Sequence, residues 1–229
     1  MRNTLIIAEA GVNHNGSIKK AKKLIDIAKN CGADFIKFQS FNAENLVTKK
    51  TLKAKYQILN TANKKEKYQF NMLKKLELSK NEFMEIIKYS KERKIKFLCS
   101  PFDIENINFL KKNKLTSVKI PSGEITNLLY LKEIGLCKFK TVFLSTGMSN
   151  IKEIKEAINI LLKYGILHKN INLLHCNSEY PTPYKDVNLN VLTTFKKFNM
   201  KIGYSDHTLG DHIAVAAIAM GSKIIEKHI

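Results

Sequence analysis

The sequence has no long apolar run. No stretch of its 229 residues approaches the roughly 18 consecutive apolar residues that a membrane-spanning helix needs, which excludes an integral helical membrane protein. The amino-terminal residues enter a strand-like run at once, and Glu9 interrupts that run, so a secretory signal is not expected. These absences predict a cytoplasmic protein with no membrane partner.

Cysteine is scarce, and no two cysteines form a C-x-x-C pair. Two of the four lie in or beside strand-like runs, where a thiol behaves as a small apolar side chain. This pattern indicates reduced, partly buried thiols in a cytosolic protein rather than a disulfide framework or a zinc site. The cysteines are Cys31, Cys99, Cys137 and Cys176.

Arginine is nearly absent, although the chain is strongly basic. The formal net charge of +19 comes almost entirely from lysines, because Arg2 and Arg93 are the only arginines. The lysines are spread over nearly every expected helix and are not interleaved with aromatic residues. Because arginine reads bases and phosphates better than lysine does, the charge predicts a solvated exterior and no nucleic-acid partner. Such a field would still attract a small anionic substrate.

The sequence does contain a unit that recurs eight times, an apolar run that ends in polar residues. The runs start roughly 20–30 residues apart, as repeated strand–helix units require. Eight parallel strands that all end in polar residues describe the upper face of a (β/α)8 TIM barrel, where such folds place their chemistry. The runs are Leu5–Ala8, Phe35–Phe38, Lys96–Leu98, Val118–Ile120, Thr141–Leu144, Ile171–Leu174, Lys201–Tyr204 and Lys223–Ile225.

One barrel domain over residues 1–229 accounts for the whole chain, and no linker or second domain is expected. Barrels usually need about 250 residues, and no residues remain for a helix after the eighth run. We therefore expect a barrel that lacks its last helix. A long polar insertion at residues 42–80 interrupts the repeat, and either a lid over the barrel mouth or disorder would explain it.

Lysines and small polar residues at neighbouring strand ends predict an anion site. Lys37 and Lys119 each end a strand, and a lysine there can bind a phosphate or, if desolvated, form a Schiff base. Ser122 follows Lys119, and the Ser-Thr-Gly segment at residues 145–147 supplies hydroxyls and a close-approaching backbone. The segment at residues 9–16, with Glu9 and His14, is a further candidate for the site.

Two histidines follow the last two strands, so they should be neighbours across the barrel mouth. His207 and His228 are flanked by Asp206 and Glu226. Two imidazoles completed by oxygen ligands or water suit a divalent cation such as Mn²⁺, Fe²⁺ or Co²⁺. The sequence therefore predicts a metal site at this edge.

Seven segments at or near the strand ends carry most of the polar residues. They are residues 7–16 (IAEAGVNHNG), 37–39 (KFQ), 119–124 (KIPSGE), 144–148 (LSTGM), 175–183 (HCNSEYPTP), 203–208 (GYSDHT) and 226–228 (EKH). Taken together, these segments closely resemble the sialic acid synthase family, which includes N-acetylneuraminate, legionaminate and pseudaminate synthases. The resemblance runs through nearly the whole chain.

The resemblance implies condensation of phosphoenolpyruvate with an N-acetylated hexosamine such as N-acetylmannosamine, with release of phosphate. His207 and His228 would hold the metal, Mn²⁺ before Mg²⁺ or Co²⁺. The expected catalytic residues are Glu124, Lys37 and Lys119. Phosphoenolpyruvate would contact Lys37, Lys119, Ser122, Ser145, Thr146, Gly147 and Ser178. The sugar would contact Glu9, Gln39, Glu124 and Tyr180.

Other interpretations stay open. A legionaminate synthase that uses a 6-deoxy di-N-acetyl hexose fits the same motifs. A Schiff-base aldolase at Lys37 or Lys119 and an inactive truncated barrel are the remaining alternatives. The resemblance also implies an antifreeze-like domain that completes the partner's site in a homodimer, and we expect residues 1–229 to form the barrel without that domain.

Overall fold

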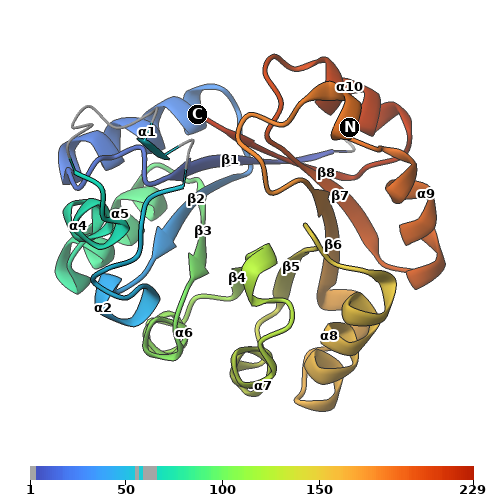
Figure 1. Ribbon diagram of the computed structural model, residues 1–229, viewed down its shortest axis with the longest axis horizontal. Helices are drawn as coiled ribbons and strands as arrows, with labels where there is room; N and C mark the ends of the chain where they lie inside the picture. Colours follow the sequence, from blue (N-terminus) through green and yellow to red (C-terminus); the bar gives the residue numbers. More distant parts are fainter. Residues whose placement is uncertain (1–3, 55–56, 59–65) are drawn as a thin grey trace.

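Eight parallel strands form a nearly closed barrel with helices around it (Figure 1). The computed structural model describes residues 4–54, 57–58 and 66–229. The strand order is β3-β2-β1-β8-β7-β6-β5-β4, and the two end strands β3 and β4 lie next to each other. The predicted (β/α)8 barrel is therefore confirmed. The strands are β1 (Leu5–Gly11), β2 (Phe35–Ser40), β3 (Lys96–Pro101), β4 (Ser117–Ile120), β5 (Thr141–Ser145), β6 (Ile171–Cys176), β7 (Lys201–Asp206) and β8 (Ile224–His228).

The outer helices begin at the capping residues that their sequences supply. Ser17 accepts a hydrogen bond from the backbone N–H of Lys20, and Ser79 and Asn150 each form a reciprocal capping box. The main helices are α1 (Ile18–Asn30), α2 (Ala43–Leu46), α4 (Gln69–Leu76), α5 (Lys80–Glu92), α6 (Ile104–Lys112), α7 (Leu128–Cys137), α8 (Ile151–Lys163), α9 (Asn190–Phe195) and α10 (His212–Ala219). Short 3₁₀ turns are η1 (Ser122–Glu124), η2 (His168–Asn170), η3 (Tyr184–Asp186) and η4 (Lys196–Phe198).

Most strands run one to three residues beyond the predicted apolar runs. The ladder between β6 and β7 continues through His175 and Tyr204, and the ladder between β7 and β8 ends at the pair Asp206 and Lys227. Many of the polar residues expected after the strands therefore lie within the strands, at their carboxyl ends. Sequence reasoning missed this because polar residues also signal loops.

A small apolar cluster fills the barrel lumen and forms the floor of the upper face. Six strands contribute one buried residue each, and the rings of Phe35 and Phe143 meet edge to face with centroids 5.7 Å apart. Side chains two positions apart on a strand share a face. The residue two positions after each of these floor residues therefore also points inward, at the level above. The floor consists of Ile7, Phe35, Leu98, Phe143, Leu174 and Ile224.

The described parts of the insertion at residues 42–80 pack beside the barrel. Phe41, Ala43 and Leu73 form a separate apolar cluster, and Phe102 packs against it. The expected lid depends partly on residues 55–56 and 59–65, which lie outside the described residues. All four cysteines are free, and three of them are buried, as predicted.

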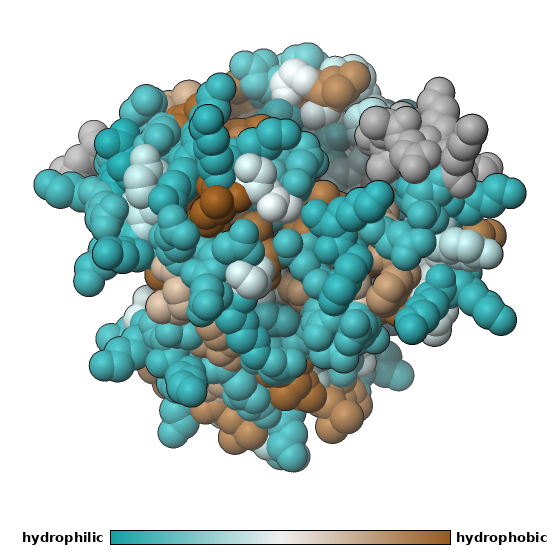
Figure 2. All heavy atoms as spheres, turned by 90° about the vertical axis from the view of Figure 1, so that its left-hand side faces the viewer, coloured by the Kyte–Doolittle hydropathy of each residue, from teal (hydrophilic) through white to brown (hydrophobic). Residues whose placement is uncertain are grey.

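The side of the molecule that carries α1, α4 and α5 is mostly hydrophilic (Figure 2). Surface ion pairs join neighbouring helices there, such as Lys22 Nζ and Glu85 Oε1 at 2.6 Å. This agrees with the expected lysine-rich, solvated exterior. Within the described ranges, none of the helices is both long enough and apolar enough to cross a membrane.

Candidate active site

A cavity of about 200 Å³ opens at the carboxyl ends of the strands, directly above the apolar floor. Six strands each place in it the residue two positions after a floor residue, so the alternation of the strands builds the wall. Those wall residues are Glu9, Lys37, Ser100, Ser145, Cys176 and Glu226. Of the predicted site residues, the cavity is lined by Glu9, Lys37, Gln39, Lys119, Ser122, Ser145, Ser178, Tyr180, His207 and His228.

Two lysines and two glutamates form a buried charge cluster in this cavity. Lys37 Nζ lies 3.0 Å from Glu226 Oε1 and 3.3 Å from Glu9 Oε2. Lys119 Nζ lies 2.8 Å from the same Glu226 oxygen, which also accepts a hydrogen bond from Ser205 Oγ at 2.7 Å. Buried charges are costly unless they are paired. Glu226 therefore holds the two ammonium groups together at the wall of the cavity.

The two carboxylates of this cluster differ in protonation. Burial would raise the pKa of Glu226, but Lys119 and Lys37 outweigh it and hold that pKa well below the usual range. Burial is the largest influence on Glu9 and raises its pKa. Lys37 lowers this pKa and Glu226 raises it, and the net result is a pKa of about 7. Glu9 can therefore exchange a proton near neutral pH while Glu226 stays ionised.

The two lysines differ as well. Burial lowers the pKa of Lys37, but Glu226 and Glu9 more than offset this effect, and the net shift is upward. At Lys119 burial outweighs Glu226, and the pKa falls. A Schiff base needs a neutral amine. The clamped ammonium of Lys37 is thus a poor nucleophile and a good anion ligand.

Small residues at the ends of three strands, β4, β5 and β6, complete the anion side of the cavity. The backbone N–H of Gly147 donates to Ser122 Oγ at 3.0 Å, and Ser122 Oγ lies 3.1 Å from Cys176 Sγ. A Cβ added at Gly147 would lie 2.8 Å from both Ser122 Oγ and Ser178 Oγ. Glycine is therefore required here by close approach, and it lets the hydroxyls face the cavity.

A further hydroxyl points into the cavity without a partner. Ser100 is only 2% exposed, and among the described residues its Oγ has no hydrogen-bond partner. Buried polar groups are normally satisfied, so an orphan hydroxyl in a binding cavity indicates a ligand atom. Ser100 was not among the predicted site residues.

His207 and His228 meet at the rim, with ring centroids 5.6 Å apart. His207 Nδ1 lies 2.6 Å from the carbonyl oxygen of Asn177, to which it can only donate. Its Nε2 is therefore left with the lone pair. The ring of Tyr180 stacks on His207 at a centroid distance of 4.1 Å. Burial, chiefly, lowers the pKa of both imidazoles, which keeps them neutral.

This donor set fits a weakly held divalent cation. Two neutral imidazoles can ligate, but the described part of the chain contains no group of three or more histidine, cysteine, aspartate or glutamate side chains suited to a metal. Asp206, expected as a possible oxygen ligand, is wrong for that role because it binds Lys227 on the outer face of the barrel. The remaining ligands would be water and substrate oxygens, which suits Mn²⁺ or Co²⁺.

Three predicted site residues do not line the cavity. Glu124 Oε2 accepts a hydrogen bond from Asn127 at 2.8 Å, and the Thr146 hydroxyl donates to the Leu174 carbonyl oxygen at 3.0 Å. Gly147 contributes its close-approaching backbone, as described above.

His14, in the candidate segment 9–16, does not face the cavity either. It is buried near the ring of Phe38 and accepts from the Gly16 N–H. This segment therefore contributes Glu9 to the cavity, while His14 has a structural role.

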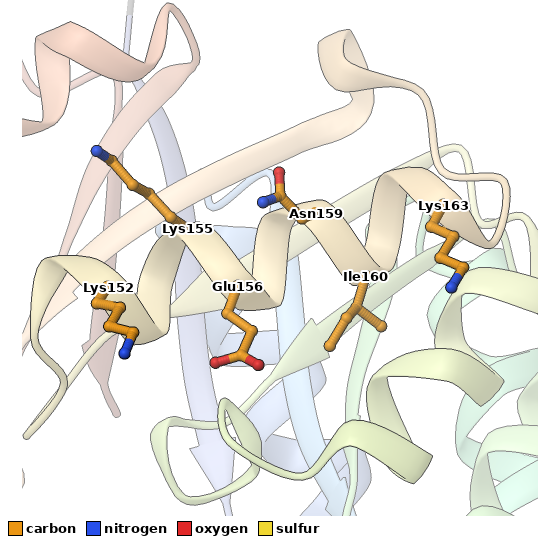
Figure 3. A pocket seen from close by; sticks show the side chains of 6 residues that line it. All are labelled: Lys152, Lys155, Glu156, Asn159, Ile160 and Lys163. Carbon is orange, nitrogen blue, oxygen red and sulfur yellow. The ribbon is translucent and has the colours of Figure 1, made fainter.

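A second hollow, of about 350 Å³, lies on the outer surface of α8 (Figure 3). All of its lining side chains come from this one helix, and they splay apart along it. Such an arrangement brings no groups together, in contrast to the barrel mouth. The lining residues are Lys152, Lys155, Glu156, Asn159, Ile160 and Lys163.

Comparison with known proteins shows the family and supports the barrel fold. The sequence model of the NeuB family matches residues 24–229. The chain belongs to the NeuB family. It is 52% identical over 229 residues to the N,N'-diacetyllegionaminic acid synthase of Campylobacter jejuni, covering 100% of this chain and 68% of that protein. It is 34% identical to the human N-acetylneuraminate-9-phosphate synthase, covering 98% of this chain and 61% of that protein.

A solved structure carries the same barrel. The N-acetylneuraminic acid synthetase of Leptospira borgpetersenii, in complex with citrate, superimposes with a TM-score of 0.84 at 36% identity, covering 98% of this chain and 72% of that chain. This NeuB-family chain thus spans about two thirds of the length of the curated relatives described above.

Eight residues that line the cavity were not among the predicted catalytic, substrate or metal residues, and three of them carry polar or charged side chains used in the argument above: Ser100, Ser205 and Glu226. A simple signal could have found two of them. Ser205 precedes His207 by two positions, and Glu226 precedes His228 by two, so each shares the inward face of its strand with a histidine.

Proposed function

We propose that this chain is the catalytic barrel of a nonulosonic acid synthase. It would condense phosphoenolpyruvate with an N-acetylated hexosamine such as N-acetylmannosamine and release phosphate. The observation that carries the proposal is the convergence of two buried ammonium groups and two neutral imidazoles on one cavity. The names of the relatives at 52% and 34% identity support the same reaction class.

In this proposal the anion side of the cavity binds phosphoenolpyruvate. Lys37 and Lys119 would neutralise its phosphate and carboxylate, and Ser122, Ser145 and Ser178 would donate hydrogen bonds. The orphan hydroxyl of Ser100 would gain a partner. Because Glu226 fixes both lysines before the substrate arrives, little ordering would remain to be done on binding.

The proposed reaction forms one C–C bond and, from water, one C–O bond, and it breaks the C–O bond to phosphate. The enol π electrons at C3 attack the sugar aldehyde carbon, and the aldehyde oxygen gains a proton, which Glu9 can donate. Water adds at C2 and loses a proton. Phosphate then leaves with the C–O bonding electrons, and the C2 carbonyl forms as its hydroxyl loses a proton.

His207 and His228 would hold a divalent cation, Mn²⁺ first and Mg²⁺ or Co²⁺ as alternatives. When bound, such an ion supplies Lewis acidity toward an aldehyde oxygen. Glu9, Gln39 and Tyr180 line the cavity, and the Gln39 amide donates to Glu9 Oε1 at 3.3 Å. These three side chains would orient the sugar. Glu124, beside the cavity, stays a candidate for proton transfer through movement of η1.

The test is phosphate release with Mn²⁺ and phosphoenolpyruvate, with and without an acceptor. Release should require the sugar and should stop with a chelator or in the Lys119→Met variant. N-acetylmannosamine and a 6-deoxy di-N-acetyl hexose are assayed in parallel, because the relatives include an N-acetylneuraminic acid synthetase and an N,N'-diacetyllegionaminic acid synthase. Sugar-independent release would overturn the proposal, and so would a borohydride-trapped pyruvate adduct that forms in the presence of a chelator.

A further inference from the structure

The two histidines of the rim are held by the sheet to different extents. His228 is the last residue of β8 and pairs with Glu9 of β1, where the Ile229 N–H donates to the Glu9 carbonyl oxygen at 3.1 Å. His207 lies beyond the end of β7, because the ladder between β7 and β8 stops at Asp206 and Lys227. Outside the ladder, the His207 carbonyl oxygen accepts a hydrogen bond from the Thr182 N–H at 2.9 Å, and further contacts hold the residues on both sides of His207.

Lys227, the residue before His228, binds the residues on both sides of His207. Its Nζ donates to Asp206 Oδ2 at 2.7 Å and to the Thr208 carbonyl oxygen at 2.9 Å. The second Asp206 oxygen accepts from the Thr208 N–H at 2.9 Å and from its hydroxyl at 2.7 Å. The backbone around His207 is thus enclosed in a ring of hydrogen bonds that is anchored on β8.

This ring lies on the outer face of the barrel, away from the substrate cavity. Asp206 and Lys227 are not among the residues that line the cavity, and the Asp206 side chain is fully buried. Strand alternation explains the arrangement. His207 and His228 point inward, so the residues that precede them point outward and meet behind the rim.

We propose that Lys227 is a positioning residue that fixes His207 relative to His228 and so sets the affinity of the rim for a divalent cation. The inference rests on the proposed function, because it assumes that the two imidazoles bind a metal. Groups that orient metal ligands from behind typically change metal affinity by about 10- to 100-fold when removed.

The sign of the effect distinguishes this role from simple electrostatics. Lys227→Met removes a positive charge next to a cation site, which by charge alone would tighten metal binding. Loss of positioning instead predicts Mn²⁺ binding that is about 10-fold weaker or more. Mn²⁺ binding is measured by electron paramagnetic resonance without substrates. Lys227→Arg, which can donate to both oxygens, should stay within about threefold of the unmodified protein.

Three controls separate positioning from general damage. Lys223→Met removes an exposed lysine just before β8 and should leave Mn²⁺ affinity unchanged. Asp206→Asn combined with Lys227→Met leaves no unpaired buried carboxylate and should still weaken Mn²⁺ binding. Phosphoenolpyruvate binding without metal should be unaffected in every variant, because it depends on the lysines of the cavity, and a disrupted barrel would lose it.

The outcomes are distinct. If Lys227→Met binds Mn²⁺ as tightly as the unmodified protein or more tightly, the inference about Lys227 is overturned and the proposed function is not. If the single variant does not fold, the same result in the double variant has the same meaning. No Mn²⁺ binding by the unmodified protein would instead remove the metal from the proposed function.

Discussion

The two ends of the barrel contain hollows of different size and different chemistry. The hollow at the amino ends of the strands is larger, about 660 Å³, and is lined by Lys96, Lys201 and Lys223 among others. The cavity at the carboxyl ends is about 200 Å³. The lower lysines are exposed, whereas Lys37 and Lys119 are 5% and 2% exposed and share one carboxylate.

This difference shows that neither volume nor lysine content makes a site. Exposed ammonium groups are hydrated and screened by salt, so they bind small anions weakly. Buried ammonium groups have already lost their water and are fixed by Glu226. An anion that enters the upper cavity therefore meets donors in place, and the same residue type has a different function at each end.

The largest expected effect is at the upper lysines. Lys119→Met should weaken phosphoenolpyruvate binding by about 100-fold or more, because a charge-assisted contact in a buried site is lost. The free energy of unfolding should also fall by about 2 kcal/mol or more, since Glu226 keeps only one ammonium partner. Calorimetric titration and denaturant unfolding measure the two quantities. Unchanged affinity would mean that the anion binds elsewhere.

A second prediction concerns Gly147. Gly147→Ala places a methyl group 2.8 Å from Ser122 Oγ and Ser178 Oγ, so one or both hydroxyls must turn away. We expect phosphoenolpyruvate affinity to fall on the order of tenfold, with a stability change below about 1 kcal/mol, because the displaced atoms are side-chain ends. Full affinity in this variant would show that these hydroxyls do not contact the ligand.

The charge of Glu9 should make anion binding in the upper cavity depend on pH. Burial raises its pKa from 4.5 to about 7, so the carboxyl is neutral below that pH and repels an anion above it. Sulfate, which does not titrate in this range, should bind roughly three- to tenfold more tightly at pH 6 than at pH 8. Glu9→Gln should abolish the dependence, and a dependence that survives in this variant would assign it to another group.

The smallest effect is expected at the lower end. Lys201→Met should leave phosphoenolpyruvate affinity unchanged and alter the free energy of unfolding by less than about 0.5 kcal/mol, as is usual for an exposed side chain. The same titration and unfolding experiments apply. A loss of affinity comparable to that of Lys119→Met would erase the contrast between the two ends.

Much of the fold could be predicted from the sequence. The eight apolar runs, their spacing and the polar residues that follow them indicated the barrel because these signals are local. The identities of Lys37, Lys119, His207 and His228 could also be predicted, because a parallel barrel brings all strand ends to one rim. The predicted carboxyl ends of most strands lay one to three residues before the observed ends, because polar residues within a strand resemble loop residues in sequence.

The sequence by itself determined the barrel and the residue types that reach its mouth, through periodicity and strand ends. Only the tertiary structure decided their partners. It placed Glu9 in the charge cluster and Glu124 outside it, turned Asp206 toward Lys227, and made Glu226 the shared partner of both lysines. The reason is that burial and pairing depend on which face of a strand meets which neighbour, and that is settled when the sheet closes.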